Sequence, residues 1–205
     1  PMRAMKSLCG VGLLLALTSL PLHAQQVPVI EKTLSNGMKL LLVERHDDPS
    51  VAGGWVAHVG SSNERPGMTG FAHLFEHMMF QGSAQVKKME HVSLLQEAGG
   101  IVNGSTRFDY TNYYQALPAN ALERALWLEA DRMRSLDVSA ENLKNQQNVV
   151  SEEVRVNVLN QPHGAFDWIE IWERANTNWH NAHNFYGDLA ELEAANIEDV
   201  RSFFK

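Results

Sequence analysis

Two histidines and a glutamate lie within the segment AHLFEHMMF, residues 72–80, whose other residues are apolar. A polar side chain buried without a partner costs roughly 2–7 kcal/mol, and a buried charge costs more. At about 100° per residue, a helix would place His73, Glu76 and His77 within an arc of roughly 100°. Imidazoles four residues apart on one helix can bind the same zinc ion. The segment therefore predicts part of a zinc site, and two core histidines bonded to backbone carbonyls are the alternative.

A third ligand is expected from the segment NQQNVVSEEVR, residues 145–155. On a helix, Glu153 would project between Val149 and Val150 on the apolar face, whereas Glu152 would lie about 100° away at the edge of that face. A carboxylate on an apolar face needs a cation as its partner. The helical angles therefore favour Glu153 over Glu152 as the group that completes the histidine pair.

The residue patterns around these motifs alternate between strand and helix signals. Asn36-Gly37 lies between two apolar runs and predicts a hairpin turn. Thr69 is a candidate N-cap for the helix that carries the histidines, and Pro162 prevents the helix that carries Glu153 from continuing. Such hairpin-joined strands and helices indicate an α+β fold, a mostly antiparallel sheet covered by helices, rather than a doubly wound βαβ fold. The sequence predicts strands over residues 29–34, 38–44, 51–59, 101–106 and 110–117, and helices over residues 69–80, 87–98, 118–136, 139–160, 164–175 and 196–205.

The N-terminal residues have the pattern of a secretory signal peptide. Arg3 and Lys6 precede a short apolar run over residues 11–17, and Ala24 supplies a small residue at a plausible cleavage point. The run is too short to span a membrane, so no stable membrane anchor is expected; the alternative is a buried N-terminal helix. We therefore expect residues 1–24 to be a signal peptide and residues 25–205 to be an exported domain, periplasmic in a Gram-negative bacterium.

Composition and charge argue against a disordered protein, a disulfide-stapled protein and a nucleic-acid-binding protein. With 44% hydrophobic and 20% charged residues, the chain has the composition of a globular domain. The single cysteine, Cys9, lies within the predicted signal, so the exported domain would have no disulfide and would be held by its core and by a metal. Without Arg3 and Lys6 the chain keeps 15 basic residues against 24 acidic ones, a net charge of −9. Nucleic acid is therefore not expected as a partner.

Taken together, the motifs resemble the pitrilysin/insulinase family of inverted (HxxEH) zinc metallopeptidases. The resemblance rests on the H-x-x-E-H order, with a glutamate 76 positions after the second histidine, and on three segments. These are GSSNERPGMTGFAHLFEHMMFQGS (60–83), AGGIVNGSTRFDYTNYY (98–114) and NQQNVVSEEVR (145–155). It covers roughly residues 29–205 and implies an N-terminal metallopeptidase domain of the pitrilysin and mitochondrial-processing-peptidase type, incomplete at its C-terminal end.

The resemblance also implies a mechanism and partners. His73, His77 and Glu153 match the family's ligands for one zinc ion per chain, and Glu76 matches its catalytic base. The implied activity is that of a zinc metalloendopeptidase acting on peptides or small unfolded proteins. A homologous C-terminal domain or a partner subunit is expected to complete the chamber. The alternative is a non-catalytic structural or partner subunit of the same fold, or a fragment inactive without its C-terminal half.

Further residues have expected roles of their own. Asn103 and Gly104 resemble the family's edge strand, which binds an extended substrate backbone; a hairpin turn at Asn-Gly is the alternative. Glu129 is a candidate outer partner for a zinc histidine, and pairing with Arg132 is the alternative. Gln146 stands where some family members carry a further glutamate. Two additional histidines, His180 and His183, are expected in a polar loop.

Overall fold

The computed structural model describes residues 27–204, so the predicted signal peptide lies outside the described residues. The chain divides into two units, with the boundary between Asp47 and Asp48. None of the helices in the described part of the chain has both the length and the apolar character that a membrane span requires.

The described part of the first unit contains an antiparallel hairpin. Its strands are β1 (Ile30–Thr33) and β2 (Lys39–Leu42). The Asn36 side chain accepts a hydrogen bond from the Met38 amide at 3.1 Å, and Gly37 adopts a positive φ of 86°. Glycine reaches this conformation without steric cost, so the predicted turn at Asn36-Gly37 is confirmed.

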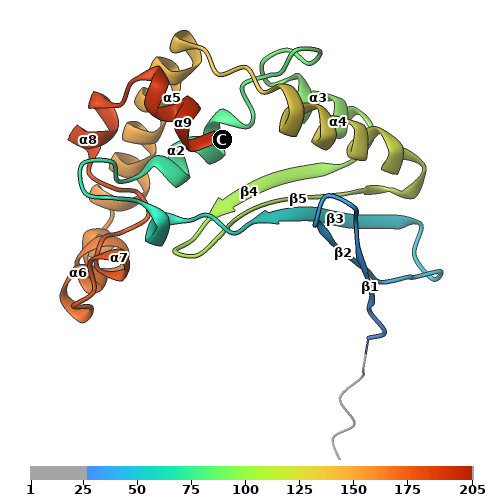
Figure 1. Ribbon diagram of the computed structural model, residues 1–205, viewed down its shortest axis with the longest axis horizontal. Coiled ribbons are helices and arrows are strands. Elements are labelled where there is room, and N and C mark those ends of the chain that lie inside the picture. Colours follow the sequence, from blue (N-terminus) through green and yellow to red (C-terminus); the bar gives the residue numbers. More distant parts are fainter. Residues whose placement is uncertain (1–26, 205) are drawn as a thin grey trace, which may run out of the picture. The chain divides into compact units, whose positions relative to one another are not determined.

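The second unit contains a three-stranded antiparallel sheet in the order β3-β5-β4 (Figure 1). The strands are β3 (Ser50–Ala57), β4 (Ile101–Thr106) and β5 (Thr111–Pro118). Tyr113 of β5 is paired with Trp55 of β3 on one side and with Gly104 of β4 on the other. Strand β4 is therefore at an edge of the sheet within the described residues. This sheet confirms the predicted antiparallel arrangement.

Helices lie over one face of this sheet and extend beyond one end of it (Figure 1). The connections between them include short 3-10 and π turns. The helices are α2 (Phe71–Met78), α3 (Glu90–Glu97), α4 (Leu122–Ser135), α5 (Ala140–Val154), α6 (Ile171–Ala175), α7 (Trp179–Ala182), α8 (Leu189–Ala194) and α9 (Ile197–Phe204), and the turns are η1 (Ser61–Asn63), η2 (Ala119–Ala121), η3 (Arg155–Leu159) and η4 (Phe166–Glu170).

The structure corrects several predicted helices. The helix expected over residues 139–160 leaves α-helical geometry after Val154 and continues as the π turn η3, and the one expected over 164–175 is η4 followed by α6. Helices α7 and α8 were not predicted, because four and six residues are too few to show a helical period.

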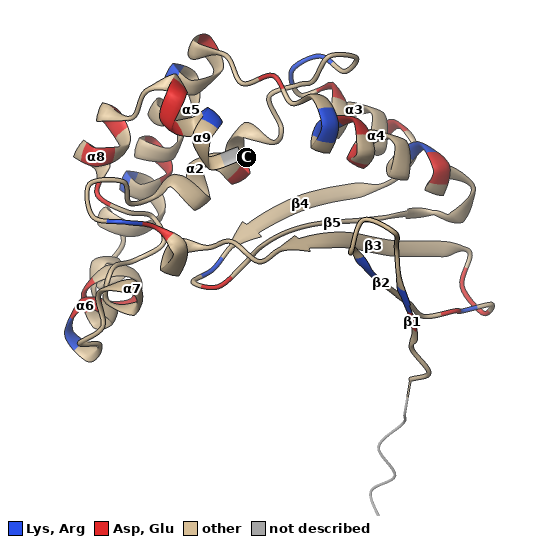
Figure 2. Ribbon diagram, in the orientation of Figure 1, with Lys and Arg blue, Asp and Glu red and all other residues tan. Residues whose placement is uncertain are grey.

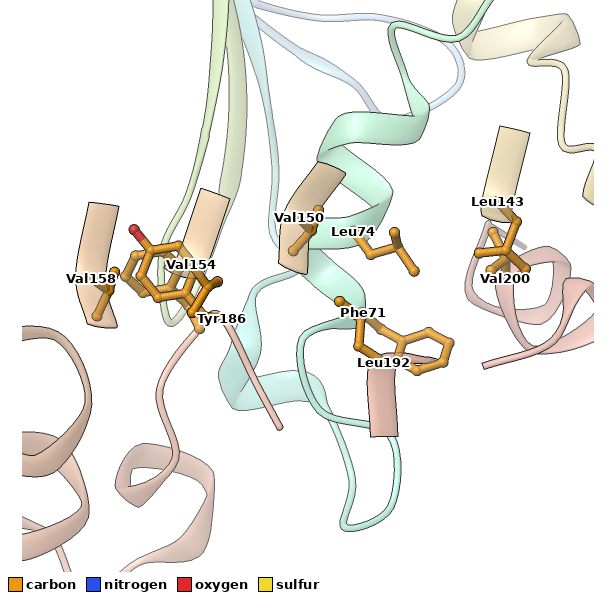
Figure 3. Close-up of a cluster of buried hydrophobic side chains, with 10 residues drawn as sticks. Phe71, Leu74, Leu143, Val150, Val154, Val158, Tyr186, Leu192 and Val200 are labelled. Carbon is orange, nitrogen blue, oxygen red and sulfur yellow. The ribbon is translucent and has the colours of Figure 1, made fainter. Parts of the chain in front are cut away.

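Two apolar clusters hold the second unit together. The first joins α2, α5 and the C-terminal helices (Figure 3); within it Leu74 of α2 and Val150 of α5 are almost fully buried. The second joins α3, α4 and β5 through Leu95, Leu117 and Leu128. The first cluster packs α2 against α5, which are the two helices that carry the predicted metal ligands.

A buried polar cluster connects α4 to the sheet and to α3. Arg132 donates two hydrogen bonds to Glu129, at 2.7 and 2.6 Å, and Trp55 Nε1 of β3 donates to the same carboxylate at 2.7 Å. His91 of α3 places Nε2 3.5 Å from it. Burial raises the pKa of Glu129, but the nearby His91 imidazole and the charge and hydrogen bonds of Arg132 outweigh burial and hold that pKa below its usual value. Glu129 is therefore an ionised carboxylate inside the core.

We predict that Arg132→Ala lowers the free energy of unfolding by about 3–5 kcal/mol, because it leaves the Glu129 carboxylate buried without its cation. Urea unfolding followed by circular dichroism measures the change. The control is Arg134→Ala on the same helix, where the side chain is exposed and the expected change is under about 0.5 kcal/mol. Equal stabilities of the two variants would show that the ion pair does not hold α4 in place.

Candidate metal centre

The apolar sides of α2 and α5 place their polar residues opposite one another. On α2, Phe71 and Leu74 are buried in the cluster that also contains Val150 of α5. His73 and His77 lie beside this contact, near Glu153 of α5. The predicted N-cap at Thr69 is wrong, because the helix begins after Gly70, whose φ is 82°. Thr69 therefore does not cap the helix that carries the histidine pair.

His73, His77 and Glu153 form one compact group. The Glu153 carboxylate lies 3.1 Å from His77 Nε2 and 3.9 Å from His73 Nε2. One ligand atom from each residue lies within 4.8 Å of the others. Zinc held tetrahedrally with bonds of about 2.0–2.2 Å needs ligand atoms roughly 3.4 Å apart. The three side chains therefore fit a zinc ion and leave a fourth position for another ligand.

The protonation states of these side chains also suit a metal. Burial and the nearby His77 lower the pKa of His73 to about 4, against the opposing effect of Glu153. A hydrogen bond from His77 lowers the pKa of Glu153, and partial burial opposes it only in part. Metal ligands must be deprotonated. A neutral imidazole and an ionised carboxylate are therefore already available near neutral pH.

Glu76 lies beside this group but has its own environment. Thr106 of β4 donates a hydrogen bond to Glu76 Oε2 at 2.6 Å. Gly104 of the same strand approaches so closely that a Cβ atom there would lie 2.9 Å from Oε1. Burial raises the pKa of Glu76, although the Thr106 hydrogen bond and the charge of His77 oppose that rise. The carboxylate is thus oriented by β4 and takes up a proton more readily than an exposed one.

A cleft between α2, β4, α5 and the connection before α3 contains all four of these side chains. Asn103 and Gly104 line it as well, and both are paired with β5, so the alternative of a hairpin turn there is excluded. The lining residues are His73, Glu76, His77, Phe80, Gln81, Lys88, Met89, Asn103, Gly104, Asn145, Gln146, Val149 and Glu153.

The helical angles of α5 predicted correctly that Glu153 faces the histidines and that Glu152 is solvated. They wrongly placed Val149 on the buried face. The Glu152 side chain is 66% exposed and lies near Arg155, whereas Glu153 is 28% exposed and faces the histidines. Val150 is buried in the core, but Val149 is exposed and lines the cleft. Glu153 therefore lies where the core face of α5 meets the cleft.

The expected outer partnership of Glu129 with a zinc histidine is not seen. Its carboxylate is already occupied by Arg132 and Trp55, which is the alternative pairing. His73 Nδ1 is buried and has no hydrogen-bond partner within residues 27–204. Glu129 thus holds α4 to the sheet and does not orient His73.

Glu64, which no sequence pattern indicated, is a buried residue that holds the N-terminus of α2. Its carboxylate accepts hydrogen bonds from the amides of Gly70 at 3.0 Å and Ala72 at 2.8 Å. His183 Nε2 lies 3.1 Å from the same carboxylate, and His183 Nδ1 lies 2.9 Å from the Trp179 carbonyl. Because both partners only accept hydrogen bonds, the imidazolium form of His183 satisfies both. The predicted polar loop is thus right in part: His183 lies in the connection after α7 as an anchor, whereas His180 belongs to α7 itself.

The amino-acid sequence of this chain is similar to that of a known family of peptidases. The family model described as Insulinase (Peptidase family M16) matches residues 39–177. Zinc protease PqqE of Helicobacter pylori is 33% identical over 205 residues, covering 98% of this chain and 46% of that protein. The insulin-degrading enzyme of Homo sapiens is 32% identical over 132 residues, covering 62% of this chain and 13% of that enzyme.

Solved structures have the same fold. A protease from Helicobacter pylori superposes with a TM-score of 0.83 at 26% identity, covering 88% of this chain and 43% of that one. Pitrilysin superposes with a TM-score of 0.76 at 22% identity, covering 89% of this chain and 20% of pitrilysin. The first half of the periplasmic protease PqqL from Escherichia coli superposes with a TM-score of 0.75 at 21% identity, covering 86% of this chain and 39% of that structure. The chain spans less than half the length of each of these proteins.

We predict that Glu153→Gln severely weakens zinc binding, because an amide replaces the one anionic side chain among the three candidate ligands. Glu152→Gln is the matched control on the adjacent, exposed position, and it should change zinc affinity little, since a solvated charge is mostly screened. Zinc titration of both variants with a competing chelator compares them directly. Loss of zinc in Glu152→Gln with retention in Glu153→Gln would overturn this choice of ligand.

The low pKa of His73 predicts how the stability of the metal-free protein depends on pH. The unfolded chain takes up a proton at His73 near its ordinary value of 6.5, whereas the folded chain does so only near 4. Stability is thus unaffected above about pH 6.5 and falls as the pH drops towards 4, by up to about 3 kcal/mol. Urea unfolding in a chelator at pH 7 and pH 5 should show a smaller difference for His73→Gln; an equal difference would contradict the role of His73.

Proposed function

Because this chain belongs to the insulinase family of peptidases, peptidase family M16, we propose that it is a zinc-dependent endopeptidase acting on peptides or small unfolded proteins. The observation that carries the proposal is the convergence of His73, His77 and Glu153 next to the separately oriented carboxylate of Glu76. This arrangement supplies three metal ligands and one base, which are the groups that metal-assisted hydrolysis of a peptide bond requires.

We assign His73, His77 and Glu153 as the ligands of one zinc ion per chain. Their separations and their protonation states fit the ion, as described above. When bound, zinc would polarise the peptide carbonyl and lower the pKa of a water molecule to near neutrality. Packing of α2 against α5 holds the histidines and Glu153 in place before any ligand arrives, so little rearrangement is needed on binding.

Glu76 acts as general base and then as general acid in this proposal. It accepts a proton from the attacking water and gives that proton to the amine that leaves. Thr106 holds one carboxylate oxygen by its hydrogen bond, which fixes the orientation of the other. The raised pKa of Glu76 suits a group that must both take up and release a proton during one turnover.

The substrate backbone would bind along β4. This strand is at the sheet edge within the described residues, and Asn103 and Gly104 of the strand line the cleft beside Glu76. An extended peptide can add to such an edge by main-chain hydrogen bonds. Because Gly104 has no side chain, the peptide can approach the Glu76 carboxylate closely.

The proposed enzyme needs further parts and an exported location. Because the chain spans less than half the length of its relatives, we propose that residues 25–205 are a metallopeptidase domain completed by a homologous domain or a partner subunit. The periplasmic location named for PqqL agrees with the signal peptide expected at residues 1–24. A non-catalytic subunit would have no use for Glu76, so that alternative is less well supported.

We predict that Glu76→Gln keeps zinc but reduces peptide hydrolysis by roughly 10²–10⁴-fold, because an amide cannot take up the proton from water. Fluorogenic peptide assays on the full-length protein, with zinc content measured in parallel, report both quantities. Glu97→Gln, on the exposed face of α3, is the control and should hydrolyse peptides at the rate of the unaltered protein. Loss of zinc in Glu76→Gln, or full activity without the carboxylate, would refute its role as base.

A further inference from the structure

One cation in the cleft is not needed by the proposed hydrolysis. Lys88 lines the same cleft as the histidine pair and Glu153, and it is the only lysine or arginine among the lining residues. Its Nζ donates a hydrogen bond to Asn145 Oδ1 at 2.9 Å, and Gln146 Nε2 donates to the same oxygen at 2.8 Å. Within the described residues, no carboxylate pairs with Lys88. Its charge therefore remains available to a ligand.

Lys88 lies in the connection between α2 and α3, whose lysines are blue in Figure 2. Hydrogen bonds of the neighbouring residues hold the backbone there. The preceding residue, Lys87, donates its amide to Glu90 at 2.7 Å. The following residue, Met89, donates its amide to the Phe80 carbonyl and has a positive φ of 61°. A positive φ in a residue other than glycine costs about 1–3 kcal/mol and is concentrated at functional sites. The strained backbone thus holds Lys88 at the cleft instead of leaving it on a free loop.

In the zinc-loaded protein, no negative charge among the described residues of the cleft would be left to balance the positive charge of Lys88. Glu76 and Glu153 are the acidic residues that line the cleft, and one divalent zinc ion would balance their two negative charges. The protein as a whole is acidic, with a net charge of −7, so a local surplus of positive charge is not a general property of its surface. An acidic ligand group would be attracted to this part of the cleft.

We propose that Lys88, oriented by Asn145, forms a basic subsite that selects peptides with an acidic side chain. Asn145 precedes Glu153 by eight residues on α5, which corresponds to about 12 Å along the helix axis. An extended peptide advances roughly 3.3 Å per residue. That separation equals the length of about three or four extended residues, so a Glu scanned through a decapeptide samples it in either direction. This subsite rests on the proposed peptidase function, and its chemistry is that of a glutamate or aspartate in the substrate.

Binding and hydrolysis of matched peptides test the subsite. The probes are fluorescent decapeptides of Ala, Thr and Leu with one Glu scanned through the sequence, and counterparts with Gln or Lys at the same position. Binding is measured by anisotropy on the zinc-loaded Glu76→Gln protein, and hydrolysis is measured on the protein with Glu76 intact. We expect the best Glu peptide to bind about three- to fivefold more tightly than its Gln counterpart, with a smaller ratio in high salt.

Charge variants assign the preference to one residue. Lys88→Ala should abolish the preference for Glu over Gln, and Lys88→Glu should reverse it in favour of the Lys peptide. The control is Lys87→Ala, since this neighbour is also exposed but does not line the cleft, and it should keep the preference. Asn145→Asp should reduce the preference by pairing with Lys88 while that lysine remains.

The outcomes separate this inference from the proposed function. An unchanged Glu preference in Lys88→Ala, or no difference between the Glu and Gln peptides in the unaltered cleft, overturns the subsite even if all peptides are hydrolysed. A Lys88-dependent Glu preference without any hydrolysis by the full-length protein, with Glu76 intact and its completing domain or subunit present, supports the subsite and refutes the peptidase. Absence of binding for every peptide overturns the subsite as well.

Discussion

The contact between the apolar sides of α2 and α5 is the interaction on which the site depends. Leu74 and Val150 are almost fully buried in the cluster that joins the two helices, and the cost of exposing such side chains to water fixes how the helices face one another. His73, His77 and Glu153 lie on the sides that this packing turns towards the cleft. The cost of burying these polar groups in the absence of a metal is offset by the apolar core behind them.

Two buried ion pairs hold neighbouring parts of the second unit in place. Glu64 holds the amides at the start of α2 and pairs with His183, while Glu129 and Arg132 hold α4 against the sheet. In each case a carboxylate and a cation compensate one another inside the protein. Removing one member would leave a buried charge, so such pairs restrict the fold to one arrangement even where they add little net stability.

Local patterns predicted much of the fold and most of the candidate site, and long-range contacts account for what was missed. The helical angles of His73, His77 and Glu153, and the turn at Asn36-Gly37, depend only on neighbouring residues. Glu64 could not be recognised, because it caps a helix that begins several residues later and its partner, His183, is 119 positions away. In the same way, the pairing of Glu129 with Arg132 on one helix was foreseeable, whereas its hydrogen bond from Trp55, 74 positions away, was not.

The open edge of β4 has a consequence for which proteins could be cut at all. An edge that binds by main-chain hydrogen bonds needs a partner whose own amides and carbonyls are free over several residues. A folded protein has already paired those groups, so it must open locally before it can lie beside Gly104 and Glu76. The free energy of that opening would then enter the rate of cleavage, and resistance to proteolysis would be a property of the client's conformational stability as much as of its sequence.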